Sequence, residues 1–191
     1  MDCFGTCGGN DLCESMSTNI WSNYGYFNGD VNADFRADVT DIMKQISFIV
    51  ESDYPNQYEF WASDMNYDLY LNVVDVVELS NGILGSNLRN IDNAYANLLN
   101  NQLTTYGSIG GIEFSGQLVS ELNGDDQIIS NNGKNLIFNL SGFIETDLFI
   151  FEKAPDFILV ASASGSLLDV NSSGHKLQIK AYPNPFNPLT K

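Results

Sequence analysis

Basic residues are scarce in this chain. It contains 8 lysines and arginines against 24 aspartates and glutamates, for a formal net charge of −16. Nucleic acids and anionic membrane surfaces bind to basic patches, so neither is an expected partner. Such an acidic surface favours divalent cations instead. The scarcity of lysine and the abundance of Asn, Gly, Ser, Thr and Tyr indicate a secreted protein, extracellular or at a cell surface.

Long apolar runs and catalytic residue patterns are also missing. No stretch approaches the ~20 apolar residues of a membrane span. No charged-then-apolar segment opens the chain, so we expect that a targeting sequence has been removed. The single histidine, His175, cannot serve a Ser/His/Asp or Cys/His arrangement, and no phosphate-binding glycine motif is present. We therefore expect no enzymatic activity.

Cysteine is limited to three residues near the start, Cys3, Cys7 and Cys13. An odd number cannot pair completely within the chain. We expect one disulfide, from Cys13 to either Cys3 or Cys7, in an irregular cap over residues 1–28. The string from Asp2 to Asn10 resembles cysteine–glycine repeats of secreted bacterial proteins.

The most informative feature that is present is a pattern written twice, from Asp30 to Asp41 and again 34 residues later from Asp64 to Asp75. Each copy places oxygen-bearing side chains at positions 1, 3, 5, 9 and 12 of a twelve-residue loop. A Ca²⁺ ion takes six to eight oxygen ligands from this kind of loop, including the carbonyl at position 7. The pattern therefore predicts two Ca²⁺ ions, which would cancel four of the sixteen negative charges.

The predicted ligands come from both loops, with position 9 acting directly or through water. They are Asp30, Asn32, Asp34, the Arg36 carbonyl, Asp38 and Asp41 in loop one, and Asp64, Asn66, Asp68, the Tyr70 carbonyl, Asn72 and Asp75 in loop two.

Apolar residues at helical spacing follow each loop and predict helices over 38–52 and 72–84, the second ended by Gly82 and Gly85. The same spacing predicts a connecting helix over 86–105. From residue 106 the period changes to two, which predicts a small antiparallel β-sandwich over 106–182. Its expected strands are 110–119, 126–130, 134–141, 146–152, 156–163 and 175–182. Three prolines predict an extended tail over 183–191. The expected fold is thus an α+β multidomain chain.

The duplicated unit, residues 29–85, resembles the dockerin family. The resemblance rests on aspartate at position 12, a helix after each loop with no clear helix before it, and the short offset between copies. It implies two EF-hand-like loop–helix units that fold around two Ca²⁺ ions. It also implies a cohesin partner bound through loop positions 10 and 11, which here are Val39, Thr40, Val73 and Val74. Equally, these four residues could pack against the rest of this chain.

One departure from the family pattern is at position 6, where Phe35 and Leu69 replace the usual glycine. Glycine supplies the backbone freedom for a sharp turn. We therefore expect weaker Ca²⁺ binding or an altered turn. Loop two has one carboxylate fewer than loop one and should bind its ion more weakly.

Two further resemblances concern the second half of the chain. The segment from Ile109 to Val170 looks like a cohesin-type sandwich, on the residues of 110–116 and 156–161. The tail from Tyr182 to Pro188 resembles the opening of the C-terminal sorting domain of type IX secretion substrates. Together they imply a secreted structural or adhesion module with dockerin/cohesin-type contacts, in one chain or between chains. The alternatives are a self-assembling filament subunit, or a non-catalytic fragment of a larger polysaccharide-acting protein.

Overall fold

The computed structural model describes residues 28–85, 94–172 and 182–183. Its fold is mixed α+β, with more strand than helix. The helices of these residues are α2 (Val39–Ile49), α3 (Gln57–Ser63) and α4 (Val73–Leu84). The strands are β1 (Tyr70–Leu71), β2 (Tyr95–Leu99), β3 (Gln102–Tyr106), β4 (Ile109–Ser115), β5 (Gln127–Asn131), β6 (Lys134–Phe138), β7 (Leu148–Ile150), β8 (Ile158–Ser162), β9 (Leu167–Leu168), β10 (Val170–Ser172) and β11 (Tyr182–Pro183). Throughout these ranges, every helix is too short or too polar to traverse a bilayer.

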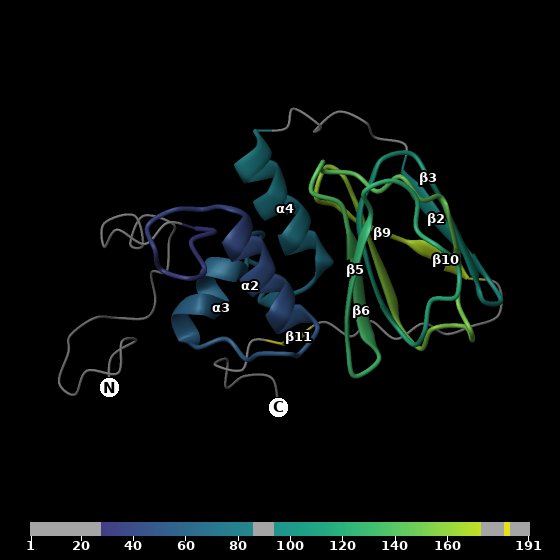
Figure 1. Cartoon of the computed structure of the whole chain (residues 1–191), viewed down its shortest axis with the longest axis horizontal. Coiled ribbons are helices and arrows are strands. Elements are labelled where there is room, and N and C mark those ends of the chain that lie inside the picture. The colour runs from purple at the N-terminus through teal and green to yellow at the C-terminus, as the bar shows by residue number, and fades with distance from the viewer. Residues whose placement is uncertain (1–27, 86–93, 173–181, 184–191) are drawn as a thin grey trace.

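Three layers make up the fold (Figure 1). A five-stranded sheet, ordered β5-β6-β4-β8-β9, lies in the middle. The helices cover one of its faces, and a four-stranded sheet, ordered β10-β2-β3-β7, covers the other. The two sheets therefore stack as a β-sandwich with helices packed on one side.

Alternation along the central strands builds two separate cores. On β4, Ile112 and Phe114 join the core between the sheets, whereas Glu113 meets the helices. On β6, Leu136 and Phe138 pack with the helices and Ile137 packs with the second sheet. Successive side chains of a strand point to opposite faces, so a strand covered on both sides becomes continuously apolar.

Two glycines on β4 allow α4 to lie close to the sheet. A Cβ atom at Gly111 would lie 2.4 Å from a Val73 methyl group, and one at Gly110 would lie 2.7 Å from Val77. The hydrophobic cluster among the helices also includes Leu159 of β8. The duplicated unit and the central sheet thus share the first of the two cores, the one between the helices and the sheet.

The two predicted helices after the loops are confirmed, with bounds inside the expected ranges. Asp38 and Asn72 act as their N-caps, and each helix begins with a reciprocal capping box. Gly85 ends α4 in the left-handed conformation, with φ of 62°.

The connecting helix predicted over 86–105 is wrong where the structure describes that range, from residue 94 onward. Strands β2 and β3 form a hairpin there and belong to the four-stranded sheet. Ala96, Leu98 and Leu103 point into the core, while Tyr95 and Leu99 stay exposed on the outer face. These outward apolar side chains produced the helical spacing in the sequence.

The expectation of no clear helix before loop two is also wrong, because α3 ends immediately before it. Asn56 and Glu59 form a capping box at its start, directly after Pro55. This capping box is a recognised sequence sign of a helix start.

The five strands expected between residues 110 and 163 are found, four of them shorter than predicted and β5 shifted by one residue. The sheets are not wholly antiparallel, because β10 pairs with β2 in parallel. Strand β11 pairs with β1, at the edge of loop two. The strand predicted over 175–182 lies almost wholly outside the described residues. The cysteine-bearing cap and most of the proline tail lie outside them too, with Cys3, Cys7 and Cys13.

A buried carboxylate lies between the helices and the sheet. Glu113 Oε2 accepts a hydrogen bond from the backbone N–H of Val73 at 3.3 Å, and its Oε1 forms an ion pair with Lys134 at 3.3 Å. Burial raises the pKa of Glu113 to about 7, although the nearby Lys134 ammonium acts to lower it. Charge at this position is therefore unfavourable for the folded state.

The substitution Glu113→Gln should raise the melting temperature at pH 8. The folded protein binds the proton of Glu113 more tightly than the unfolded chain, so wild-type stability falls as pH rises from about 4.5 to 7. The loss amounts to roughly 3 kcal/mol at most. Thermal unfolding from pH 4.5 to 8 should show the gain from the substitution growing with pH. Glu51→Gln removes the exposed partner of Lys134 and is the control. A variant less stable than wild type at pH 8 contradicts the prediction.

Candidate metal centre

The two duplicated loops adopt the same backbone shape. Ala33 and Phe35 have φ of 62° and 71°, and their counterparts Tyr67 and Leu69 have 60° and 70°. These are positions 4 and 6 of each loop, and all four residues are in the left-handed conformation. The turn at position 6 is therefore kept, without glycine and with backbone strain.

The carboxylate at position 1 organises each loop. Asp30 accepts hydrogen bonds from the N–H groups of Asp34 and Phe35, at 3.0 and 2.9 Å. Asp64 accepts the equivalent pair from Asp68 and Leu69, at 3.1 and 3.0 Å. Both loops thus close around a buried aspartate.

The aspartate at position 12 ties each loop to its helix. Asp41 accepts from the N–H groups of Asn32 and Asp38, at 3.0 and 2.9 Å. Asp75 accepts from Met65 and Asn72, both at 2.9 Å. Both carboxylates are fully buried, and each brings the end of its loop back to the beginning.

Four buried carboxylates, those of Asp30, Asp41, Asp64 and Asp75, therefore lack a cationic partner. The ion pairs of the described residues all involve Lys44 or Lys134, and none includes a loop aspartate. Burial raises the pKa of Asp64 to about 6, and it raises the pKa of Asp75 well above its usual range. Neighbouring aspartates add to both shifts. A cation near these groups would offset this cost.

The remaining predicted ligands are more exposed. Asn32 accepts from the N–H of Asp34, and Asp34 from that of Arg36. Asn66, Asp68 and Tyr70 repeat this arrangement in loop two.

The position-9 residues, Asp38 and Asn72, use their side-chain oxygens as helix caps. Hydrogen bonds from Thr40 lower the pKa of Asp38. These oxygens would therefore reach a bound ion through water more readily than directly.

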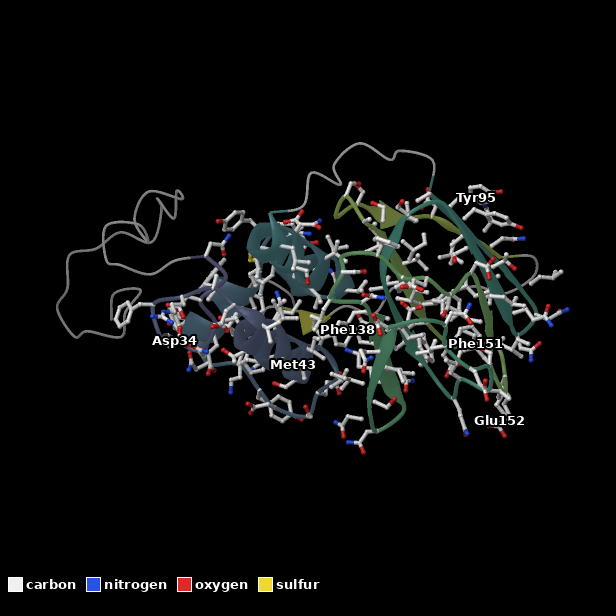
Figure 2. All side chains as sticks on the ribbon, turned by 45° about the horizontal axis from the view of Figure 1, so that its top comes forward. Asp34, Met43, Tyr95, Phe138, Phe151 and Glu152 are labelled. Carbon is white, nitrogen blue, oxygen red and sulfur yellow. The ribbon has the colours of Figure 1, made fainter. Side chains whose placement is uncertain are left out.

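No three His, Cys, Asp or Glu side chains form a metal-holding group within residues 28–85 and 94–172. The predicted ligand sets also use asparagine side chains and backbone carbonyls, which suit a hard cation such as Ca²⁺. The uncompensated buried carboxylates and this oxygen-only donor set fit a divalent cation. Figure 2 places Asp34 of loop one at the end of the molecule away from the sheets.

Contacts between α3 and the start of loop one had no counterpart in the sequence pattern. The Tyr58 hydroxyl of α3 donates to the backbone carbonyl of Asp30. Gly29 N–H donates to the carbonyl of Ala62 at 3.0 Å. The Asn56 capping box could have revealed the helix that carries Tyr58, but not the contact itself.

The four residues predicted to bind a partner fall into two pairs. Val39 and Thr40 of copy one are exposed. Val73 and Val74 of copy two are buried, and Val73 packs against Gly111 of β4. For copy two, the alternative of packing within the chain therefore describes the structure.

No family model, curated protein or solved structure matches this chain.

Replacing Phe35 with glycine should stabilise the protein. An L-residue in the left-handed conformation costs roughly 1–2 kcal/mol, against roughly 0.5–1 kcal/mol for the extra chain entropy of glycine. The Phe35 side chain is exposed, so little packing is lost. We expect the free energy of unfolding to rise by about 0.5–1 kcal/mol in urea denaturation. The neighbouring Ala37→Gly, where no left-handed strain exists, should lower it. Equal destabilisation by both variants would refute the strain argument.

Proposed function

We propose that this protein is a secreted, non-catalytic structural or adhesion module that binds two Ca²⁺ ions. In this proposal residues 29–85 form a dockerin-like pair of loop–helix units that makes cohesin-type contacts with a protein partner. The observation that carries it is the repetition of one loop geometry around buried aspartates that form no ion pair with a lysine or arginine of the described residues. The secreted location rests on composition and on the resemblance of the tail to type IX sorting domains.

Calcium would act by stabilising the fold. Asp30 and Asp41 would hold the first ion with Asn32, Asp34 and the Arg36 carbonyl, and the matching residues of loop two would hold the second. An ion that binds only the folded chain raises its stability by mass action. Clustered carboxylates would repel one another less once the ion joins them.

The internal duplication supports a docking surface on copy one. In copy two, Val73 and Val77 are 0% and 3% exposed and lie against Gly111 and Gly110 of the sheet. The residues 34 positions earlier are Val39 and Met43, which are 45% and 46% exposed. Two equivalent apolar stripes thus exist, and in the described structure only one is covered.

We expect a β-sheet face of another protein to cover the Val39–Met43 stripe, because a sheet face covers the equivalent Val73–Val77 stripe of copy two. The five-stranded sheet of this chain is already covered by helices on one side and by strands on the other. A filament in which this sheet receives the stripe of the next copy would have to displace α4. As a receptor for the stripe, the five-stranded sheet therefore favours attachment to a different partner over self-assembly.

Calcium should raise the melting temperature of the full chain by about 5–10 °C at saturating concentration, since a hundredfold excess over Kd contributes ~2.7 kcal/mol. Thermal unfolding would be followed during titration from a chelator to 10 mM Ca²⁺. Asp30→Ala should halve the number of ions bound, counted by isothermal titration. Asp125→Ala, an exposed turn aspartate outside the loops, is the control. No calcium-dependent shift in the wild type would sink the proposal.

If copy one carries the docking surface, the same substitution at the equivalent positions Val73 and Val39 should affect stability differently. Val73→Ala should cost about 2 kcal/mol of stability, because it empties a buried site. Val39→Ala should change stability by less than 0.5 kcal/mol. In pull-downs with a panel of isolated cohesin-type sandwich modules, Val39→Asp combined with Met43→Asp should abolish capture while the melting temperature holds. Capture unaffected by that double variant would place the contact elsewhere.

A further inference from the structure

The outer face of the four-stranded sheet is a second surface without a role in the proposed function. Side chains alternate along β2 and β3, so Ala96, Leu98 and Leu103 fill the core while their neighbours face outward. This outer face looks away from the helices (Figure 1). Figure 2 shows Tyr95 on it, at the opposite end of the molecule from Asp34.

Two stacked tyrosines stand at one end of this face. Tyr95 and Tyr106 are directly opposite each other on β2 and β3. Their ring centroids are 4.5 Å apart, the ring planes differ by 17°, and the side chains are 50% and 49% exposed. Each ring stiffens the other, so the pair presents a pre-ordered aromatic surface to solvent.

Uncharged groups, both polar and apolar, continue from the tyrosines across the sheet. The next row holds Asn97 opposite Thr104, with Asn171 of β10 beside Asn97 and the exposed Leu148 of β7 beside Thr104. The row after that holds Leu99 opposite Gln102, with Ile150 of β7 beside Gln102. Within the described strands, no outward position of this face carries a charge, in a chain whose net charge is −16.

We propose that this face binds a neutral glycan. The C–H face of a sugar ring is apolar and packs on an aromatic ring, while its hydroxyl groups exchange hydrogen bonds with amide and hydroxyl side chains. The stacked pair supplies the first contact, and Asn97, Thr104 and Asn171 supply the second, one row along the sheet. An acidic glycan would be repelled by the net charge of the protein.

The same charge disfavours a second copy of this chain as the occupant. Bringing two copies together opposes two net charges of −16, and the face offers no cation to compensate. A neutral polysaccharide meets no such penalty. The glycan site does not depend on the calcium proposal, because it uses no residue of either loop.

Affinity gel electrophoresis of the full chain tests the site. Gels would contain a neutral β-glucan, a neutral galactomannan or an acidic polygalacturonate. The wild type should be retarded by at least one neutral polymer and not by the acidic one. Tyr95→Ala and Tyr106→Ala should each weaken binding by about tenfold, the upper range of an aromatic contact. Tyr95→Phe should retain binding, and Tyr54→Ala, an exposed tyrosine of the helical unit, should have no effect.

Melting temperatures of all variants would establish that each one folds. If a tyrosine-to-alanine variant does not fold, Asn97→Ala, which removes the amide hydrogen-bonding groups without removing a ring, takes its place and should also weaken retardation. Retardation by no neutral polymer, or equal retardation of wild type and the tyrosine variants, overturns the proposal. Self-association that Tyr95→Ala abolishes would overturn it too, since the face would then be an interface between copies.

Discussion

The close approach of α4 to β4 is the contact on which the rest of the structure depends. Gly110 and Gly111 leave room for Val77 and Val73, so the helix that follows loop two lies directly on the central sheet. Glu113 joins the same contact through the backbone of Val73. Loop two is thereby attached to a rigid sheet, and loop one is attached to loop two through α2 and α3. A side chain at either position would collide with α4, so the helical layer could not lie this close to the sheet.

The two copies of the duplicated unit have the same loop structure but are buried to different extents. Copy two packs against the sheet, whereas copy one presents Val39 and Met43 to solvent. The loop hydrogen bonds are nearly the same in both copies, because they depend only on residues inside each loop. The environments differ because a sheet covers one copy and not the other. Positions that face the shared core, such as Ile42 and Val76, are buried in both. The outward stripe distinguishes the copies, as do Ala37 and Thr40, which are exposed where their counterparts Leu71 and Val74 are buried.

The loops and the helices after them could be predicted from local sequence, because the ligand spacing recurs and because Asp38 and Asn72 are residue types that favour a helix N-cap. The β2–β3 hairpin was not predictable from spacing, because Tyr95 and Leu99 face outward and imitate a helix. The burial of Val73 and the exposure of Val39 could not be separated either. The two residues are identical in type and loop position, and glycines about forty residues beyond Val73 decide between them. The left-handed Phe35 and Leu69 likewise follow from loop closure rather than from their own preferences.

A single residue, Asp169, separates β9 from β10, and these strands belong to different sheets. The chain therefore crosses the sandwich in one step, from a strand paired with β8 to a strand paired with β2. A pulling force applied at Ser172 would act first on β10, which is paired with β2, and then on β9, which is paired with β8 in the other sheet. It would act along the strand direction of β10, so the hydrogen bonds to β2 would share the load and not open one at a time. For a protein proposed to attach one surface to another, this crossing would act as a mechanical clamp.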